Sequence, residues 1–283
     1  MLISEALKSA TEKLVSAGVT SPSVDAELLG CFILGVQRSE LTMLLIGDET
    51  FPEDKIGKFE AALSRRVKRE PLQHITGLAP FRHLELYVGP GVFTPRPETE
   101  QLVELAIEKI KENTNPVVVD LCSGSGAIAI SLATELVAAE VYSVELSEQA
   151  FGFLERNYQK YGLDSKSARN EDLADAFDEL EAKVDLVISN PPYIPDSAVP
   201  VDLEVQLHEP SLALYGGKDG LDVIRKISSR ALYLLKPSGL LLLEHADSQA
   251  RAIGELLLSQ GWLEVTSSQD LAGKDRMISA LKP

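Results

Sequence analysis

The segment Asn190-Pro191-Pro192-Tyr193 carries groups that can hold a planar ligand with N–H bonds. It follows the apolar run 184–189, which is typical of a buried strand that ends at a turn. Proline fixes φ, lacks an N–H and keeps the residue before it extended. The segment is therefore a rigid strand exit that presents the Asn190 carboxamide, carbonyl oxygens and the Tyr193 ring. Taken alone, it could equally be a proline-punctuated loop without a ligand.

A glycine-rich turn at 120–129, Asp-Leu-Cys-Ser-Gly-Ser-Gly-Ala-Ile-Ala, directly follows another apolar run. Glycine lets a ligand approach the backbone, and the next helix offers N–H groups at its N-terminus. Gly124, Gly126 and Ala129 also fit the dinucleotide fingerprint, so the motif alone does not separate a nicotinamide cofactor from S-adenosylmethionine. The candidate cofactor-binding residues here are Asp120, Cys122, Ser123, Gly124, Ser125 and Gly126.

Acidic residues follow the next two predicted strands. Glu145 comes about 20 residues after Gly124, where an acid can accept both ribose hydroxyls of a nucleoside. Asp172 could accept from the exocyclic amine of adenine, with Leu173 packed on the ring. Each acid could instead be a solvated surface residue.

Together these four features favour methyl transfer to a planar nitrogen over hydride transfer. A dehydrogenase has no evident use for Asn-Pro-Pro-Tyr. The Asn190 side-chain oxygen and the Pro191 carbonyl can accept both N–H groups of an amide and orient its nitrogen. Positive charge grows on that nitrogen during transfer, and the two acceptors stabilise it most in the transition state. Asn190, Pro191 and Tyr193 are therefore the candidate catalytic residues.

Strand–helix alternation begins at Pro116 and predicts a parallel sheet covered by helices on both faces. The last two strands leave no room for a helix and should form a hairpin, which puts one antiparallel strand into the sheet. Ligands bind open α/β sheets at the carboxyl ends of the strands, so the four features should meet there. The predicted strands are 117–121, 141–146, 165–170, 184–189, 240–244, 263–267 and 276–281.

The first 72 residues show helical spacing and no strand pattern, which predicts a small helical domain. Residues 81–88 and 91–93 should form a hairpin around Gly89-Pro90-Gly91, followed by a helix from Pro97 to about Lys111. The expected domains are 1–75, a helical domain that could recognise a partner, 76–95, a linking hairpin, and 96–283, the sheet domain.

The 283-residue chain has a net charge of −16, which repels nucleic-acid phosphates. Its one basic cluster, 65–69, is expected to be a solvated helix end. The two cysteines and four histidines have no metal-ligand spacing, so no metal site is predicted. Without a signal peptide or a long apolar run, we expect a cytoplasmic monomer that binds neither nucleic acid nor membrane.

The chain resembles the release-factor glutamine N5-methyltransferases of the HemK/PrmC type over nearly its whole length. The resemblance implies an α/β fold of the class I methyltransferases: a Rossmann-like, seven-stranded sheet, mostly parallel, with a helical N-terminal domain and a linking hairpin. It also implies S-adenosylmethionine as methyl donor and, as substrate, the glutamine of the Gly-Gly-Gln motif in bacterial peptide chain release factors. The matching stretches are 70–77, 94–100, 120–129, 190–193, 209–210, 216–220 and 270–276.

The resemblance also implies residue roles. Pro192 would hold the glutamine together with Asn190, Pro191 and Tyr193, and Phe93 and Arg96 would line the same site. Cys122–Gly126, Glu145, the Asp172-Leu173 pair and Asn190 would hold the cofactor. This chain departs from the family at three positions, which usually carry glycine, aspartate and an aromatic residue: Cys122, Glu145 and Leu173.

Two alternatives remain open. Asn-Pro-Pro-Tyr also occurs in adenine N6-methyltransferases of DNA, but these need a basic channel and base flipping, which a charge of −16 disfavours. A non-catalytic binding protein could keep the fold, although the intact glycine turn, Glu145 and Asn190 argue against such decay.

Overall fold

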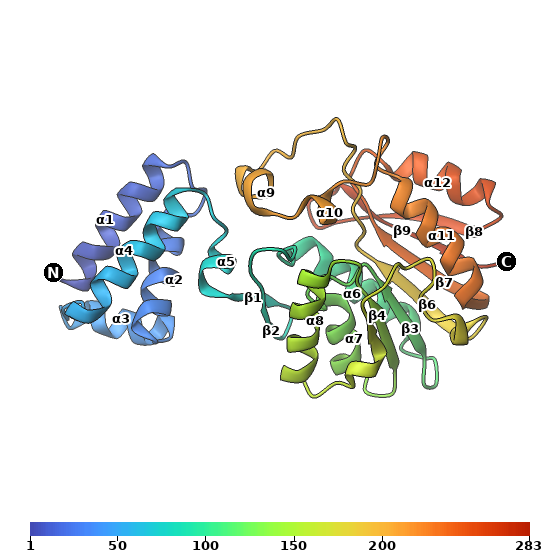
Figure 1. Ribbon diagram of the computed structural model, residues 1–283, viewed down its shortest axis with the longest axis horizontal. Helices are drawn as coiled ribbons and strands as arrows, with labels where there is room; N and C mark the ends of the chain where they lie inside the picture. The colour runs from blue at the N-terminus through green and yellow to red at the C-terminus, as the bar shows by residue number, and fades with distance from the viewer. The chain divides into compact units, whose positions relative to one another are not determined.

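The computed structural model describes residues 1–283 and divides them into two compact units (Figure 1). The first, here called the helical unit, comprises Met1–Leu78 with Pro200–His208. The second, the sheet unit, comprises Ala79–Val199 with Glu209–Pro283. The segment 200–208 thus belongs with the N-terminal helices, although it lies in the middle of the sheet unit's sequence.

The helices of the helical unit pack around one apolar core, which contains Leu14, Leu29 and Phe59. No strand begins before Leu78, so the predicted helical region is confirmed. The second helix begins at Pro22, a position where proline is favoured, and ends at Gly35, which adopts the left-handed conformation. The helices are α1 (Ile3–Ser16), α2 (Pro22–Leu34), α3 (Arg38–Ile46), α4 (Glu53–Val67), α5 (Leu72–Thr76) and α9 (Leu203–His208).

The basic cluster at the end of α4 is solvated only in part: Arg65 and Lys68 are exposed as predicted, but Arg66 is not. Arg66 is only 5% exposed, and its Nε lies 2.6 Å from an Asp25 carboxylate oxygen. Glu204 of α9 bridges the guanidinium groups of Arg66 and Arg69 at 2.9 and 2.5 Å. Buried guanidinium groups require such partners, which come from positions distant in the sequence.

The predicted hairpin is shifted along the chain. Strands β1 (Leu78–Phe81) and β2 (Leu84–Tyr87) pair around a turn in which Arg82 adopts φ +51°. Residues 88–93 form no strand, so the predicted pairing of 81–88 with 91–93 is wrong, although Gly89-Pro90-Gly91 does form a turn in which Val92 N donates to Gly89 O at 3.2 Å. Gly91 lies in this turn with φ +94°, a left-handed conformation that favours glycine.

The sheet has seven strands in the order β5-β4-β3-β6-β7-β9-β8, which confirms the predicted fold class. Only β9 runs antiparallel to its neighbours β7 and β8, as predicted for the C-terminal hairpin. The predicted strand 165–170 shrinks to two residues, because residues 165–167 form a 3₁₀ turn. The strands are β3 (Val117–Leu121), β4 (Glu140–Val144), β5 (Ala168–Arg169), β6 (Val184–Ser189), β7 (Leu235–Glu244), β8 (Leu263–Gln269) and β9 (Asp275–Leu281).

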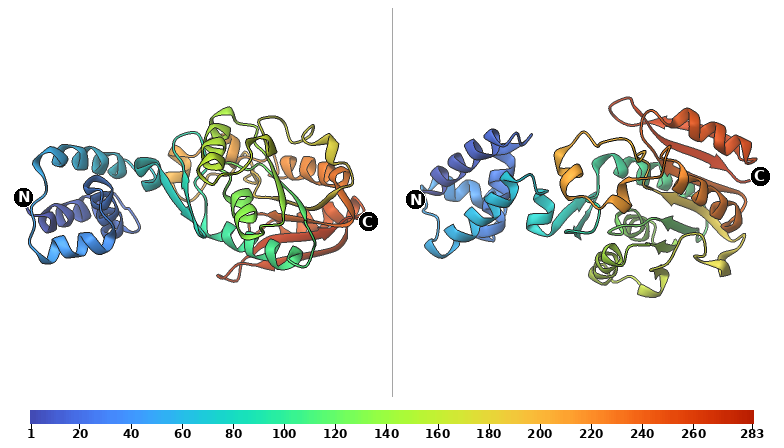
Figure 2. Two further views of the ribbon diagram at one scale, coloured as in Figure 1. Left: turned by 90° about the horizontal axis from the view of Figure 1, so that it is seen from below. Right: turned by 45° about the horizontal axis from the view of Figure 1, so that its top comes forward.

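Helices cover both faces of this sheet (Figures 1 and 2). One apolar core joins α6, α7 and α8 to the sheet, and a second joins α11 and α12 to the opposite face. β6 is buried along its whole length because both faces are covered. The helices of this unit are α6 (Pro97–Ile110), α7 (Ala127–Glu135), α8 (Glu148–Lys160), α10 (Ser211–Leu214), α11 (Asp222–Leu234) and α12 (Ala250–Ser259), with 3₁₀ turns at Ser165–Ser167 and Asp178–Leu180.

No individual helix combines the length and apolar character needed to cross a membrane. Only α2 and α3 taken together reach that threshold, and they are bent by 94° relative to each other.

Asn157 of α8 ties the hairpin to the glycine turn. Its Oδ1 accepts from Tyr87 N at 2.7 Å, and its Nδ2 donates to the carbonyls of Tyr87 and Ser125 at 3.0 and 2.9 Å. Replacing Asn157 with alanine removes three hydrogen bonds, one buried and two partly buried, and should lower the free energy of unfolding by about 2–4 kcal/mol. Urea unfolding followed by the fluorescence of Trp262, the one tryptophan of the chain, measures this in the sheet unit.

The matched control is Gln159→Ala, because Gln159 is exposed on the same helix. An Asn157→Ala midpoint equal to that of the control would show that these hydrogen bonds contribute nothing net.

Candidate active site

The candidate residues gather where five parallel strands end. β3 lies between β4 and β6, so the strand order reverses at β3, the point at which such sheets bind ligands. Backbone hydrogen bonds join the ends, from Ser123 N to Val144 O and from Glu145 N to Arg169 O, both at 3.0 Å. The residues after β3, β4, β5 and β6 therefore share one edge of the sheet, as the sequence predicted.

The glycine turn uses its residues in different ways. Cys122, Gly124 and Gly126 have φ values of +65°, +55° and +87°. A Cβ on Gly124 would meet nothing within 4 Å, so this backbone faces open space that a ligand can enter. A Cβ on Gly126 would lie 2.6 Å from Leu154 Cδ1, so that glycine serves the packing of α7 on α8. Cys122 carries a side chain in a conformation that favours glycine.

Acidic groups surround this turn. Glu145 accepts from Gly124 N and Ser147 N, at 2.8 Å each, and thereby holds the turn against the end of β4. Asp120 is fully buried without a hydrogen-bond partner for either oxygen, and burial raises its pKa to about 8. Burial also raises the pKa of Glu145. A cationic ligand would relieve both penalties, which fits a sulfonium cofactor better than the pyrophosphate of a dinucleotide.

The residues after β5 are placed less simply. Asp172 is half-buried; it accepts from Ala174 N at 3.0 Å and lies 3.6 Å from Lys226 Nζ. Leu173 is buried in the apolar core beneath α11. Their contacts to adenine stay a prediction.

Residues from other parts of the chain hold the Asn-Pro-Pro-Tyr segment in place. Pro191 and Pro192 are buried, while Asn190 and Tyr193 are half-buried. Gln249 Nε2 donates to Tyr193 O at 2.8 Å. A Cβ on Gly216 would lie 2.5 Å from Pro192 O, and one on Gly220 would overlap Tyr193 O. Gly216 and Gly220 are therefore needed for close approach to the segment.

Phe93 and Arg96 lie together before α6. The Arg96 guanidinium stacks 5.0 Å from the Phe93 ring centroid, and its Nη2 lies 3.4 Å from Glu209 Oε1. Glu209 is buried and also accepts from Thr94 N at 3.3 Å. Sequence reasoning named Glu209 only as a matching residue; it is the carboxylate that joins Arg96 to the insertion after β6.

Sequence reasoning also missed Thr99 and Glu244. Asn190 Nδ2 donates to Thr99 Oγ1 at 3.0 Å, and Thr99 Oγ1 donates to Glu244 Oε2 at 2.7 Å. Burial raises the pKa of Glu244 to about 7. Thr99 lies within the matching stretch 94–100, and Glu244 ends the predicted strand 240–244. Nothing in the sequence around either residue indicates that they contact each other or Asn190.

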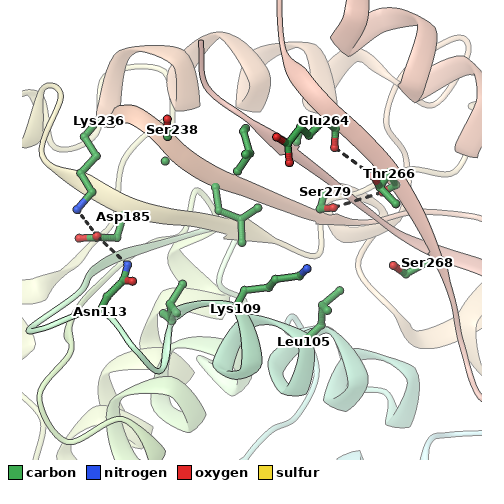
Figure 3. Close-up of a pocket in the computed structure, with 15 residues that line it drawn as sticks. Leu105, Lys109, Asn113, Asp185, Lys236, Ser238, Glu264, Thr266, Ser268 and Ser279 are labelled. Atoms are coloured by element: carbon green, nitrogen blue, oxygen red, sulfur yellow. Dashed lines mark hydrogen bonds and ion pairs between the residues drawn. The ribbon is translucent and has the colours of Figure 1, made fainter.

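A cavity of about 400 Å³ lies elsewhere, between α6 and β7–β9 near the starts of β6 and β7 (Figure 3). Its Asp185 accepts from Asn113 Nδ2 at 3.1 Å and from Val117 N at 3.0 Å and pairs with Lys236. The cavity contains none of the candidate site residues.

Replacing Glu145 with glutamine should weaken binding of S-adenosylmethionine roughly 10- to 100-fold, since one charge-assisted hydrogen bond contributes about 1.5–3 kcal/mol. The glutamine NH2 group would also face one of the two backbone N–H groups, of Gly124 or Ser147, that now donate to Glu145. Titration calorimetry measures the effect, with Glu148→Gln, an exposed acid of α8, as control. An affinity equal to that of the control would remove Glu145 from the cofactor site.

Replacing Gly216 with alanine should force the Asn190–Tyr193 segment to move, because backbone lies within 3.0 Å of the added Cβ. We expect a loss of stability of about 1–3 kcal/mol and a larger loss of methyl transfer than of cofactor affinity. In the control Gly254→Ala the added Cβ meets its nearest neighbours at 3.9 Å. Unchanged turnover in Gly216→Ala would contradict the proposed role of close packing here.

Residues 5–77 match the family model described as the PrmC N-terminal domain, and residues 83–212 match the methyltransferase small domain. Among solved structures, a methyltransferase of Pyrococcus furiosus has a TM-score of 0.51 at 19% identity, covering 71% of this chain and 90% of its own. The 16S rRNA N2 G1207 methyltransferase of T. thermophilus, solved with AdoMet and guanosine, has a TM-score of 0.52 at 22% identity, covering 73% of this chain and 50% of its own. These two likenesses concern the fold.

Sequence relatives are closer. The release factor glutamine methyltransferase of Streptomyces coelicolor is 44% identical over 278 residues, which cover 96% of this chain and 95% of the relative. That of Bifidobacterium longum is 40% identical, covering 99% of this chain and all of the relative, 100%. The chain therefore belongs to the release factor glutamine methyltransferase family.

Proposed function

We propose that this protein transfers a methyl group from S-adenosylmethionine to the side-chain nitrogen N5 of the glutamine in the Gly-Gly-Gln motif of peptide chain release factors. The observation that carries the proposal is the Asn190 carboxamide at the end of β6, held by Nδ2 so that Oδ1 stays available as an acceptor. The names of relatives that match the whole chain support this substrate over adenine in DNA.

The residues around the glycine turn suit the cofactor. Gly124 would lie against its methionine portion, Glu145 would accept the ribose hydroxyls, and the buried Asp120 would favour its positive charge. Asp172 and Leu173 would contact adenine. When bound, S-adenosylmethionine supplies an electrophilic methyl carbon whose bond to sulfur breaks as the glutamine nitrogen takes it, leaving S-adenosylhomocysteine.

Asn190 and Pro191 would act on the glutamine. Their oxygens accept its two N–H groups and orient the nitrogen toward the methyl group. This positioning matters because the lone pair of an amide nitrogen is delocalised into the carbonyl, which makes the nitrogen a poor nucleophile. They also stabilise the positive charge that develops on the nitrogen. The methylated nitrogen then releases one proton to water, so no strong base is required. Burial raises the pKa of Tyr193, which keeps its ring neutral while it packs on the amide.

The helical unit would contact the body of the release factor. With a net charge of −16, the protein is poorly suited to bind nucleic acid directly. We propose that it acts in the cytoplasm as a monomer and recognises the release factor as a protein.

The test combines the protein, methyl-labelled S-adenosylmethionine and a purified release factor, followed by mass spectrometry of the digested product. The label should appear on the glutamine of the Gly-Gly-Gln peptide, and a release factor with glutamate at that position should remain unlabelled. Label on another residue, or on duplex DNA added in its place, would contradict the proposal.

Asn190→Ala should lower turnover about 100-fold or more, the effect of losing one hydrogen-bonding group that acts on the transition state. Cofactor affinity, measured by calorimetry, should change far less. Equal turnover in Asn190→Ala and the wild type would remove Asn190 from the mechanism while leaving the substrate assignment intact.

A further inference from the structure

Three side chains from distant parts of the chain form a continuous hydrogen-bonded row. Asn190 follows β6, Thr99 lies in the first turn of α6, and Glu244 ends β7. Nδ2 of Asn190 donates to Thr99 Oγ1 at 3.0 Å, and Thr99 Oγ1 donates to Glu244 Oε2 at 2.7 Å. Thr99 and Glu244 are 4% and 2% exposed, so a substrate can reach neither.

When Glu244 is ionised, the direction of these bonds is fixed. An ionised carboxylate only accepts, so the single hydroxyl proton of Thr99 must point to Glu244. The hydroxyl oxygen can then only accept on its other side, and only the NH2 end of the Asn190 carboxamide can donate to it. The opposite end, Oδ1, must therefore face away from Thr99.

We infer that Thr99 and Glu244 are positioning residues, which fix the Asn190 carboxamide with its oxygen toward the methyl-accepting amide. This inference rests on the proposed function. Without the row, the carboxamide can turn over and present two N–H donors to the N–H groups of the substrate, an arrangement that repels it.

The surrounding backbone holds the row in place. Thr99 N donates to Arg96 O at 3.1 Å in the turn that Pro97 opens. β7 pairs directly with β6, with Leu243 opposite Ser189, which brings the ends of both strands together. Both partners of Asn190 are therefore set by the fold before a substrate arrives.

The row depends on an ionised Glu244. Burial raises the pKa of Glu244 to about 7, and the charged or titratable groups around it are Arg276, Arg96, Glu98, Tyr193 and the adjacent His245. Protonated Glu244 can donate to Thr99, which frees the hydroxyl proton to point at Asn190 and reverses the row. Turnover should therefore rise with pH through about 7.

The main test uses Thr99→Val, which keeps the shape of the side chain and removes the hydroxyl. We expect turnover to fall between about 10- and 100-fold, the usual effect of a misplaced reacting group, with unchanged cofactor affinity. Thr99→Ser should restore most of the turnover. Thr134→Val serves as the control, because Thr134 loses a comparable bond to Ile130 O near the end of α7. Wild-type turnover in Thr99→Val, or equal losses in Thr99→Val and Thr99→Ser, would overturn the inference.

A double-variant cycle tests whether Glu244 acts through Thr99. Glu244→Gln alone should lower turnover and remove the rise near pH 7. In the Thr99→Val background it should have no further effect, because coupled residues are not additive. Additive losses, or a rise near pH 7 that persists in Glu244→Gln, would overturn the role of Glu244.

A readout without substrate separates this inference from the proposed function. The side-chain NH2 resonance of Asn190, assigned in a ¹⁵N spectrum by its absence in Asn190→Ala, should be protected from exchange with water in the wild type and in Thr99→Ser. It should shift and lose protection in Thr99→Val. An unchanged resonance in Thr99→Val would overturn the row whether or not the protein methylates release factors, and a lost resonance would support it even if no release factor were methylated.

Discussion

A carboxamide is nearly symmetric in shape but has opposite hydrogen-bonding character at its two ends. Asn190 is therefore useful to a ligand only if something decides which end it presents. In this structure the decision comes from a buried hydroxyl, Thr99, whose proton is committed to a buried carboxylate, Glu244. Two features of the fold bring these three groups within hydrogen-bond distance. They are the parallel pairing of β6 with β7 and the start of α6 at Pro97.

The same strand end has a second requirement. Its two prolines make the chain stiff but remove the N–H groups that would otherwise anchor it. Anchoring therefore comes from other segments, through Gln249, which donates to Tyr193 O, and through Gly216 and Gly220, which let backbone approach backbone. The rigid Asn190–Tyr193 segment thus depends on glycines placed more than 20 residues later in the chain, which explains a glycine-rich stretch where no ligand phosphate is expected.

Much of this could be predicted because it is local. Apolar runs ended by turn residues located the strands, and the missing helix between the last two strands predicted the antiparallel hairpin. The hairpin at 78–87 was missed, because Gly89-Pro90-Gly91 has stronger turn residues than Arg82-His83 and does form a turn, but no strand follows it. Local signals identify a turn without saying whether two strands pair across it.

Thr99 and Glu244 could not have been assigned from sequence for a different reason. Their contacts span 91 and 145 residues, and a single threonine or glutamate has no pattern that announces a distant partner. The same holds for Arg66, whose cluster of like charges resembled a solvated surface until Asp25 and Glu204 were placed beside it. Charge pairing over such distances is a property of topology and enters only when the chain is folded.

The contribution of Glu204 also changes what can be cut from this protein. Because α9 completes the helical unit from the middle of the other unit's sequence, the helical unit is not one continuous segment of the chain. A fragment ending at residue 78 would leave Arg66 and Arg69 facing a missing carboxylate, and a fragment beginning at residue 79 would carry an acidic helix without its basic counterpart. The two units are distinct but interleaved in the sequence. A cut between residues 78 and 79 therefore separates Arg66 and Arg69 from Glu204.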